Sequence, residues 1–120
     1  MTGGSKTVLF VCAHGAYRSR LAAAFFNAAA PAGWHAVSAG QDPQESVSDA
    51  ALRLAAGTPA EEHLEQDAPH RLDQHPSPDR LVAIDCDVRG AERWTLDAAQ
   101  IGRAQRDEIR MRAERLAASL

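Results

Sequence analysis

The chain lacks three features that would assign it to a membrane, a nucleic acid or an oxidising compartment. No apolar run approaches the ~18–20 residues that a transmembrane helix requires. The formal net charge is −3, so the chain has no basic excess of the kind that marks nucleic-acid or membrane-surface partners, and we expect neither. The two cysteines are too few for a disulfide framework and are interpreted as free thiols. Because the opening residues do not resemble a signal peptide, a cytoplasmic location is expected.

The length and the order of predicted elements indicate one α/β domain over residues 1–120. Ser46 or Ser48 is suited to cap the second helix, and the proline-rich stretch 58–79 is expected to be a loop with one short helix at 60–66. Strands are predicted at 7–12, 34–39, 80–85 and 92–96, and helices at 18–30, 47–56 and 98–118. This alternation predicts a three-layer αβα fold, with a four-stranded parallel sheet, helices on both faces and a phosphate-binding loop after strand one.

The most informative stretch is residues 7–20, in which an apolar run ends at Cys12 and Arg18-Ser19 follows after five intervening residues. The apolar run is typical of a strand buried on both faces, and the alanine-rich segment after Ser19 favours a helix. A chance pairing of a buried strand-end cysteine with a surface arginine is the alternative interpretation. The strand, the short loop and the helix start together favour an active site.

This arrangement suits covalent chemistry on an oxyanion. Backbone N–H groups at a helix start, together with the helix dipole, favour an anion and also favour the thiolate form of a nearby cysteine. We therefore predict Cys12 as the nucleophile and Arg18 as a planar clamp for two oxygens. Ser19 is placed to donate a hydroxyl hydrogen bond toward the sulfur. The predicted substrate-binding residues are Ala13, His14, Gly15, Ala16, Tyr17 and Ser19.

Four segments carry a resemblance to a known family. Residues 8–27 resemble the opening of the low-molecular-weight protein-tyrosine-phosphatase family, which includes related thiol-dependent arsenate reductases. Residues 36–43 are similar to the strand and turn that follow the first helix of that family, and residues 79–86 are similar to its central strand. Residues 92–97, before the long last helix, complete the match. The resemblance implies a hydrolase that works through a phosphocysteine intermediate and needs no cofactor.

The chain departs from the family pattern at several positions. Gly15 stands where many members have an asparagine that braces the loop, and Tyr17 stands where some have a second cysteine. His14 with Gly15 resembles a bacterial subgroup with a Cys-x-His-Gly loop. The general acid of the family belongs to an Asp-Pro pair near the start of the last helix. This chain has no such pair there, and the nearest candidate, Asp97, lies one residue early. General acid catalysis typically raises the reaction rate by about 10²–10⁴-fold, so whether Asp97 acts as the acid strongly affects the expected rate.

Three functions fit these observations. The first is a cysteine-dependent phosphatase acting on phosphotyrosine-like phosphomonoesters, including those of a phosphoprotein. The second is an arsenate reductase that uses the same loop with an external small thiol or thioredoxin as reductant. The third is a catalytically weak phosphate or phosphopeptide binder.

A few further residues fit two roles each. Cys86 is either a buried structural thiol or a redox partner of Cys12, and without a third cysteine an internal three-cysteine relay cannot operate. Trp94 and Tyr17 are either aromatic residues at the rim of the site or packing residues. His70 and His75 lie in the proline-rich stretch rather than on a regular helix, and no metal site is predicted there.

Overall fold

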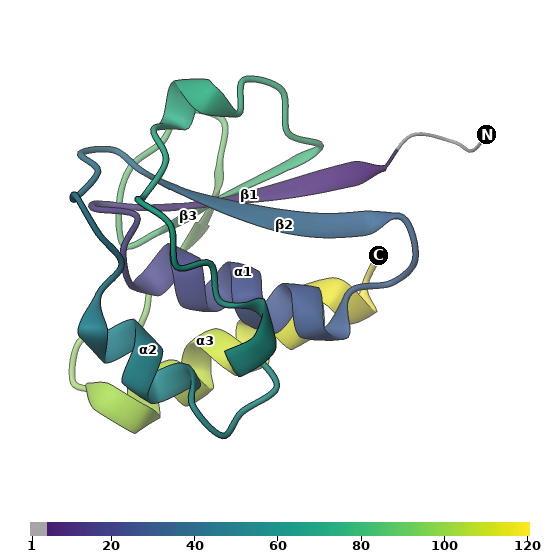
Figure 1. The fold of residues 1–120 in the computed structure, drawn as a ribbon. Coiled ribbons are helices and arrows are strands. Elements are labelled where there is room, and N and C mark those ends of the chain that lie inside the picture. The colour runs from purple at the N-terminus through teal and green to yellow at the C-terminus, as the bar shows by residue number, and fades with distance from the viewer. Residues whose placement is uncertain (1–4) are drawn as a thin grey trace.

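A four-stranded parallel sheet forms the centre of the computed structural model, which describes residues 5–120 (Figure 1). Its strands are β1 (Lys6–Cys12), β2 (Trp34–Gly40), β3 (Arg80–Ile84) and β4 (Glu92–Trp94). They lie in the order β2-β1-β3-β4, and every neighbouring pair is parallel. In this register Cys12 lies opposite Gly40, so the predicted loop begins at the carboxyl edge of the sheet. The predicted α/β fold is confirmed.

The two faces of the sheet are covered unequally. The α-helices α1 (Arg18–Ala29), α2 (Asp49–Ala55) and α3 (Gly102–Ala118) lie on one face (Figure 1), and not on both faces as the sequence predicted. The opposite face carries a loop that includes the 3-10 helix η2 (Leu72–Gln74), whereas the other 3-10 helix, η1 (Glu61–His63), packs near α1. Over residues 5–120, no helix is both long enough and apolar enough to cross a bilayer.

The alternation of side chains along β1 explains why its apolar run is continuous. Val8 and Phe10 belong to the large core under the helices, whereas Leu9 and Val11 belong to the smaller core on the other face. All four side chains are fully buried. Because both faces of β1 are buried, all of these positions are apolar, which suits a strand in the middle of the sheet.

Several element boundaries differ from the sequence-based expectation. The Asp97 carboxylate accepts a hydrogen bond from the Ala99 amide at 2.9 Å, which forms a turn, and α3 consequently begins at Gly102 rather than at residue 98. The expected helix at 60–66 is only the short η1, and the fourth strand ends at Trp94. Ser48, one of the two expected caps, caps α2 by accepting from the Ala50 amide at 3.1 Å.

Candidate active site

Cys12 lies at the carboxyl end of β1 with only 4 % of its surface exposed. Its Sγ lies 3.1 Å from the Ser19 Oγ and accepts a hydrogen bond from the Ser19 amide at 3.4 Å. The Ser19 hydroxyl also lies 3.3 Å from the Ala39 carbonyl oxygen. In the thiol form, the sulfur donates to Ser19 and Ser19 donates to Ala39. When the sulfur is deprotonated, the same hydroxyl has a second acceptor within reach, so Ser19 is placed as the sequence predicts.

The loop of residues 13–18, called the anion loop below, is held through its carbonyl groups. Backbone amides of the segment 41–48 donate to carbonyl oxygens of this loop and of Cys12 just before it. The bonds run from Gln41 to Cys12 at 3.1 Å, from Asp42 to Ala13 at 2.8 Å, from Gln44 to His14 at 3.1 Å and from Ser48 to Ala16 at 3.1 Å. Because a trans peptide points each N–H away from the preceding carbonyl, the following amides face away from the segment 41–48. Among residues 5–120, no group accepts a hydrogen bond from an amide of residues 13–18. Backbone donors that precede a helix and have no protein acceptor are suited to bind an oxyanion.

Gly15 and Gly40 bring two backbones into contact and so fix the shape of the anion loop. Gly15 has φ +68°, and a Cβ there would lie 2.6 Å from the Gly40 nitrogen. A Cβ on Gly40 would lie 2.5 Å from the His14 carbonyl carbon. Both distances are too short for any real side chain, so this contact requires glycine on both sides. This gives Gly15, which departs from the family asparagine, a physical role of its own.

Arg20 braces the anion loop from behind and was missed by the sequence analysis. It is 2 % exposed, and its Nε donates to the Gly15 carbonyl at 3.3 Å. Its Nη1 donates to the carbonyl oxygens of Glu65 and of Asp67, the latter at 2.8 Å. The spacing of the two arginines could have indicated this role. Arg18 and Arg20 are two positions apart in α1, which is about 200° of rotation, so they lie on opposite sides of the helix. If one points to the site, the other points into the protein.

Arg18 is oriented by a carboxylate that the sequence analysis did not single out. Asp85 comes just after the end of β3, and its Oδ2 lies 3.6 Å from the Arg18 Nε. Asp85 has φ +52°, and its Oδ1 accepts a hydrogen bond from the Leu96 amide at 2.9 Å. Asp85 thus joins Arg18, the predicted anion clamp, to the segment that follows β4.

We expect the Asp85→Ala substitution to lower the free energy of unfolding by about 2–3 kcal/mol, and Asp85→Asn to lower it by less than about 1 kcal/mol. Alanine pays about 1–2 kcal/mol in the left-handed region and removes the acceptor of the Leu96 amide, whereas asparagine tolerates that region and keeps an acceptor. Chemical denaturation of both variants measures the difference. Equal losses in the two variants would contradict the assigned role.

Asp97 lies in the turn before α3 and is exposed. Besides the Ala99 contact, its backbone amide donates to the Glu108 Oε1 at 3.1 Å. Asp97 forms no hydrogen bond or ion pair with Cys12 or Arg18 in the part of the chain that the structure describes. Its role as a proton donor therefore stays a prediction.

The other predicted site residues divide into loop and core. The His14 ring is exposed, and its Nδ1 lies 3.1 Å from the Asp42 carbonyl, to which it donates in the Nδ1–H tautomer. Burial raises the pKa of Tyr17 above its ordinary value, although the neighbouring Arg18 opposes this shift. Trp94 is buried and packs on Phe10 with ring centroids 5.3 Å apart, so it is a core residue rather than a rim aromatic.

Cys86 is half-buried just beyond β3, and its Sγ donates to the Val11 carbonyl at 3.5 Å. Burial raises the pKa of this thiol, and the nearby Cys12 raises it further. Both cysteines are free thiols. The structure thus brings the second thiol to the strand that carries the first.

In the Cys12→Ser variant, where Cys86 is the remaining thiol, we expect alkylation by iodoacetamide to be slower at pH 7.5 than that of N-acetylcysteine. Burial, the larger cause of the raised pKa, persists in this variant, so less thiolate is present at a given pH. The midpoint of the rate against pH is expected above that of the free thiol. A midpoint at or below that of N-acetylcysteine would contradict this assignment.

These features define a class of protein: a parallel α/β domain with a cysteine at the end of its first strand, facing an oxyanion-binding loop. An arsenate reductase from Archaeoglobus fulgidus is similar at 31% identity and a TM-score of 0.74, covering 92% of this chain and 98% of that one. The low-molecular-weight protein tyrosine phosphatase from T. tengcongensis has the same fold, with 20% identity, a TM-score of 0.69 and coverage of 97% and 100%. The chain belongs to the family of low-molecular-weight protein tyrosine phosphatases and related arsenate reductases.

A further structure shows the same fold within a longer protein. The thioredoxin-dependent arsenate reductase of Corynebacterium glutamicum has 22% identity and a TM-score of 0.76, and the match covers 99% of this chain and 63% of that one. No family model matches the sequence, and no curated protein does. The family membership therefore depends on the Archaeoglobus structure, and the activity has to be argued from the site.

Proposed function

We propose that the chain is a cysteine-dependent phosphatase that hydrolyses phosphomonoesters of the phosphotyrosine type. The observation that carries the proposal is the anion loop, whose carbonyls are all turned toward the segment 41–48 or α1 and whose amides have no acceptor among residues 5–120. A phosphoryl group bound there would lie over the Cys12 sulfur, with Arg18 beside it. We place the protein in the cytoplasm, where a reduced nucleophilic thiol persists.

The proposed reaction has two displacements. The Cys12 thiolate attacks phosphorus, the bond between sulfur and phosphorus forms, and the bond to the ester oxygen breaks while Asp97 protonates that oxygen. Water then attacks phosphorus, its proton passes to Asp97, and the bond to sulfur breaks. The anion-loop amides and Arg18 hold the three equatorial oxygens in both steps. The Ser19 amide, 3.4 Å from the sulfur, stabilises the departing thiolate.

A second candidate function is arsenate reduction, which the position of Cys86 favours. The Cys12 thiolate would attack arsenic and displace hydroxide, and a second thiol would then attack the Cys12 sulfur. That attack forms a disulfide and releases arsenite, so the two electrons come from the pair of thiols. Cys12 lies near enough to Cys86 to help raise the pKa of the Cys86 thiol, so Cys86 is a candidate for the second thiol. A small thiol or thioredoxin is the alternative. Thioredoxin dependence is stated for the Corynebacterium protein of the same fold.

The experiment that tests these proposals runs two assays on one preparation. Hydrolysis of p-nitrophenyl phosphate is followed from pH 5 to 8, and oxidation of glutathione or reduced thioredoxin is followed with and without arsenate. Hydrolysis supports the phosphatase, and arsenate-dependent oxidation without hydrolysis supports the reductase. Phosphate binding with neither activity would overturn both and leave a phosphate or phosphopeptide binder.

We expect Asp97→Ala to lower kcat for phenyl phosphate by about 10²-fold or more, because phenol is a poor leaving group that requires a proton. The Asp107→Ala variant is the control, since Asp107 lines the same surface hollow as Asp97. The fall is expected to be smaller for p-nitrophenyl phosphate, whose leaving group needs less protonation. An unchanged rate with phenyl phosphate would show that Asp97 is not the acid.

A further inference from the structure

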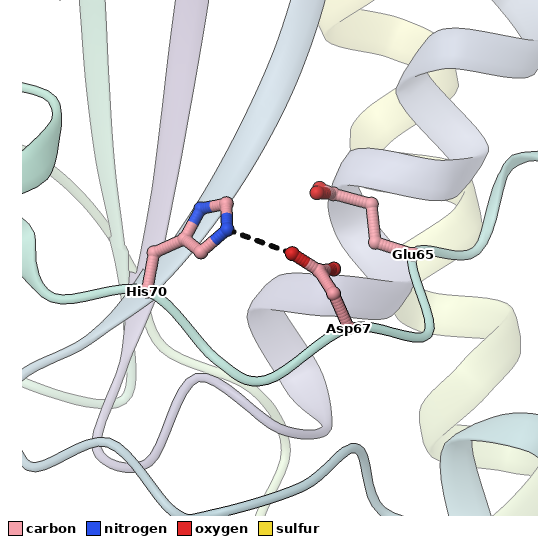
Figure 2. Close-up of side chains that lie close together, drawn as sticks. All are labelled: Glu65, Asp67 and His70. Atoms are coloured by element: carbon pink, nitrogen blue, oxygen red, sulfur yellow. Dashed lines mark hydrogen bonds and ion pairs between the residues drawn. The ribbon is translucent and has the colours of Figure 1, made fainter.

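A second cluster of titratable side chains lies behind the anion loop, in the stretch that follows η1. Glu65, Asp67 and His70 each turn one ligand atom toward the others, and these three atoms all lie within 4.8 Å of one another (Figure 2). The His70 Nε2 lies 2.9 Å from the Asp67 Oδ2. In a tetrahedral zinc site with bonds of about 2.0–2.2 Å, ligand atoms are about 3.3 Å apart. Small side-chain rotations would therefore bring the three atoms to bonding distance from one ion.

Hydrogen bonds to their backbone carbonyls hold the three candidate ligand residues in place. The buried Arg20 guanidinium donates to the carbonyl oxygens of both Glu65 and Asp67, and the Gly40 amide donates to the His70 carbonyl at 3.0 Å. All three residues are thus bonded to the body of the domain, although they belong to a loop. A site with a fixed backbone loses less conformational entropy when it binds an ion.

Neighbouring groups leave the ligand atoms in a suitable state. The His70 Nδ1 lies 3.0 Å from the His75 Nε2, so His70 can donate its Nδ1 proton to His75 and keep the Nε2 lone pair for a metal. This pattern, in which a ligating histidine donates through its other nitrogen, is the usual support of a metal-bound imidazole. The two carboxylate oxygens of Asp67 also have different neighbours: Oδ1 lies 3.6 Å from the Arg20 Nη1, and Oδ2 faces His70.

The charge balance also favours a dication. The cluster has two carboxylates and one neighbouring buried guanidinium, which pairs with Asp67, so its net charge is about −1 when His70 is neutral. One imidazole with two carboxylates suits a borderline divalent ion such as Zn²⁺ better than Ca²⁺, which prefers oxygen ligands alone. Asp67 is 56 % exposed, which leaves space for a water molecule as the fourth ligand.

We propose that Glu65, Asp67 and His70 form a binding site for a divalent transition-metal ion, Zn²⁺ being the best match, with His75 as the supporting hydrogen-bond acceptor. In the metal-bound state the ion takes the place of the proton between His70 and Asp67. The site differs from the oxyanion site, and the two are connected through Arg20, which also donates to Gly15. This proposal differs from the expectation of no metal site, which considered the spacing of His70 and His75 and not the positions of Glu65 and Asp67.

The test is a titration of the metal-free Cys12→Ser/Cys86→Ser variant, in which no thiol competes for the ion. Co²⁺ is followed by its visible absorption, and Zn²⁺ is followed by calorimetry. We expect one equivalent to bind, with affinity lowered at least 10-fold by Glu65→Gln and by His70→Ala, and lowered by about 10–100-fold when His75→Phe removes the supporting acceptor. His63→Ala, which removes an exposed histidine of η1, is the matched control and is expected to bind as the parent does.

Two results would overturn the proposal: no binding at 1:1 stoichiometry below about 0.1 mM metal, or binding that survives both Glu65→Gln and His70→Ala. Glu65→Gln keeps the size of the side chain, so it remains informative if His70→Ala unfolds, and circular dichroism of each variant checks the fold. Phosphatase and arsenate assays on the wild-type chain are separate measurements, so failure of the metal site is distinguishable from failure of the proposed function.

Discussion

The Cys12→Ser variant is expected to lose turnover of p-nitrophenyl phosphate by about 10⁴-fold or more while keeping its affinity for inorganic phosphate. A hydroxyl is a far weaker nucleophile than a thiolate, and a loss of this size corresponds to about 5.4 kcal/mol of activation barrier. The amides and Arg18 that hold the anion are unchanged by the substitution. Because the variant also lacks the negative charge of the thiolate, phosphate is expected to bind at least as tightly as to the wild type.

Turnover is measured with p-nitrophenyl phosphate, and phosphate affinity is measured by calorimetry on both proteins. Cys86→Ser is the matched control: it removes a thiol of the same chain, and the proposed hydrolysis uses only Cys12. If Cys86→Ser abolished arsenate-dependent thiol oxidation and left hydrolysis intact, Cys86 would be the second thiol of the reductase reaction. Residual hydrolysis in Cys12→Ser close to the wild-type rate would end the phosphocysteine proposal.

The second large effect is expected from Gly15→Ala, which should lower the free energy of unfolding by about 3 kcal/mol or more. An alanine at φ +68° costs about 1–2 kcal/mol, and its Cβ would overlap the Gly40 nitrogen, which adds about 1–3 kcal/mol of overpacking. Phosphate affinity should fall as well, because relief of the overlap moves the amides of the anion loop.

Gly57→Ala separates the two causes. Gly57 has φ +74°, close to that of Gly15, but a Cβ there would meet no heavy atom of the described residues 5–120 within 4 Å. This variant should therefore show only the backbone cost, about 1–2 kcal/mol, and normal phosphate binding. Denaturant unfolding compares the two variants on one scale. Equal losses of stability would mean that the contact between Gly15 and Gly40 imposes no constraint.

The sequence predicted those parts of the site that depend on neighbouring residues. Cys12, Ser19 and the loop between them follow from one strand, one turn and one helix start, all within a short stretch. The parallel sheet also followed, because the apolar run before Cys12 has no polar position. Asp97 remains a prediction, since its position depends on a turn whose geometry the sequence did not show.

The remaining parts of the site depend on segments that are distant in the chain. Asp85 meets Arg18 only because β3 lies beside β1, and its left-handed backbone leaves no clear sign in the sequence. Arg20 meets Glu65 and Asp67 across more than forty residues. The interpretation of Trp94 as a rim aromatic was open for the same reason: its burial against Phe10 is a property of the assembled core.

The bonds from the segment 41–48 to the anion loop have a consequence for folding order. The loop takes its shape from chain that is synthesised after it, so Cys12 and Arg18 can face a common anion only once β2 and that segment have docked. In a folding intermediate with only β1 and α1 formed, the Cys12 thiol would be unprotected, and the anion loop beside it would not yet bind an anion. Acquisition of phosphate affinity during refolding would thus report the docking of residues 41–48, independently of the formation of helix.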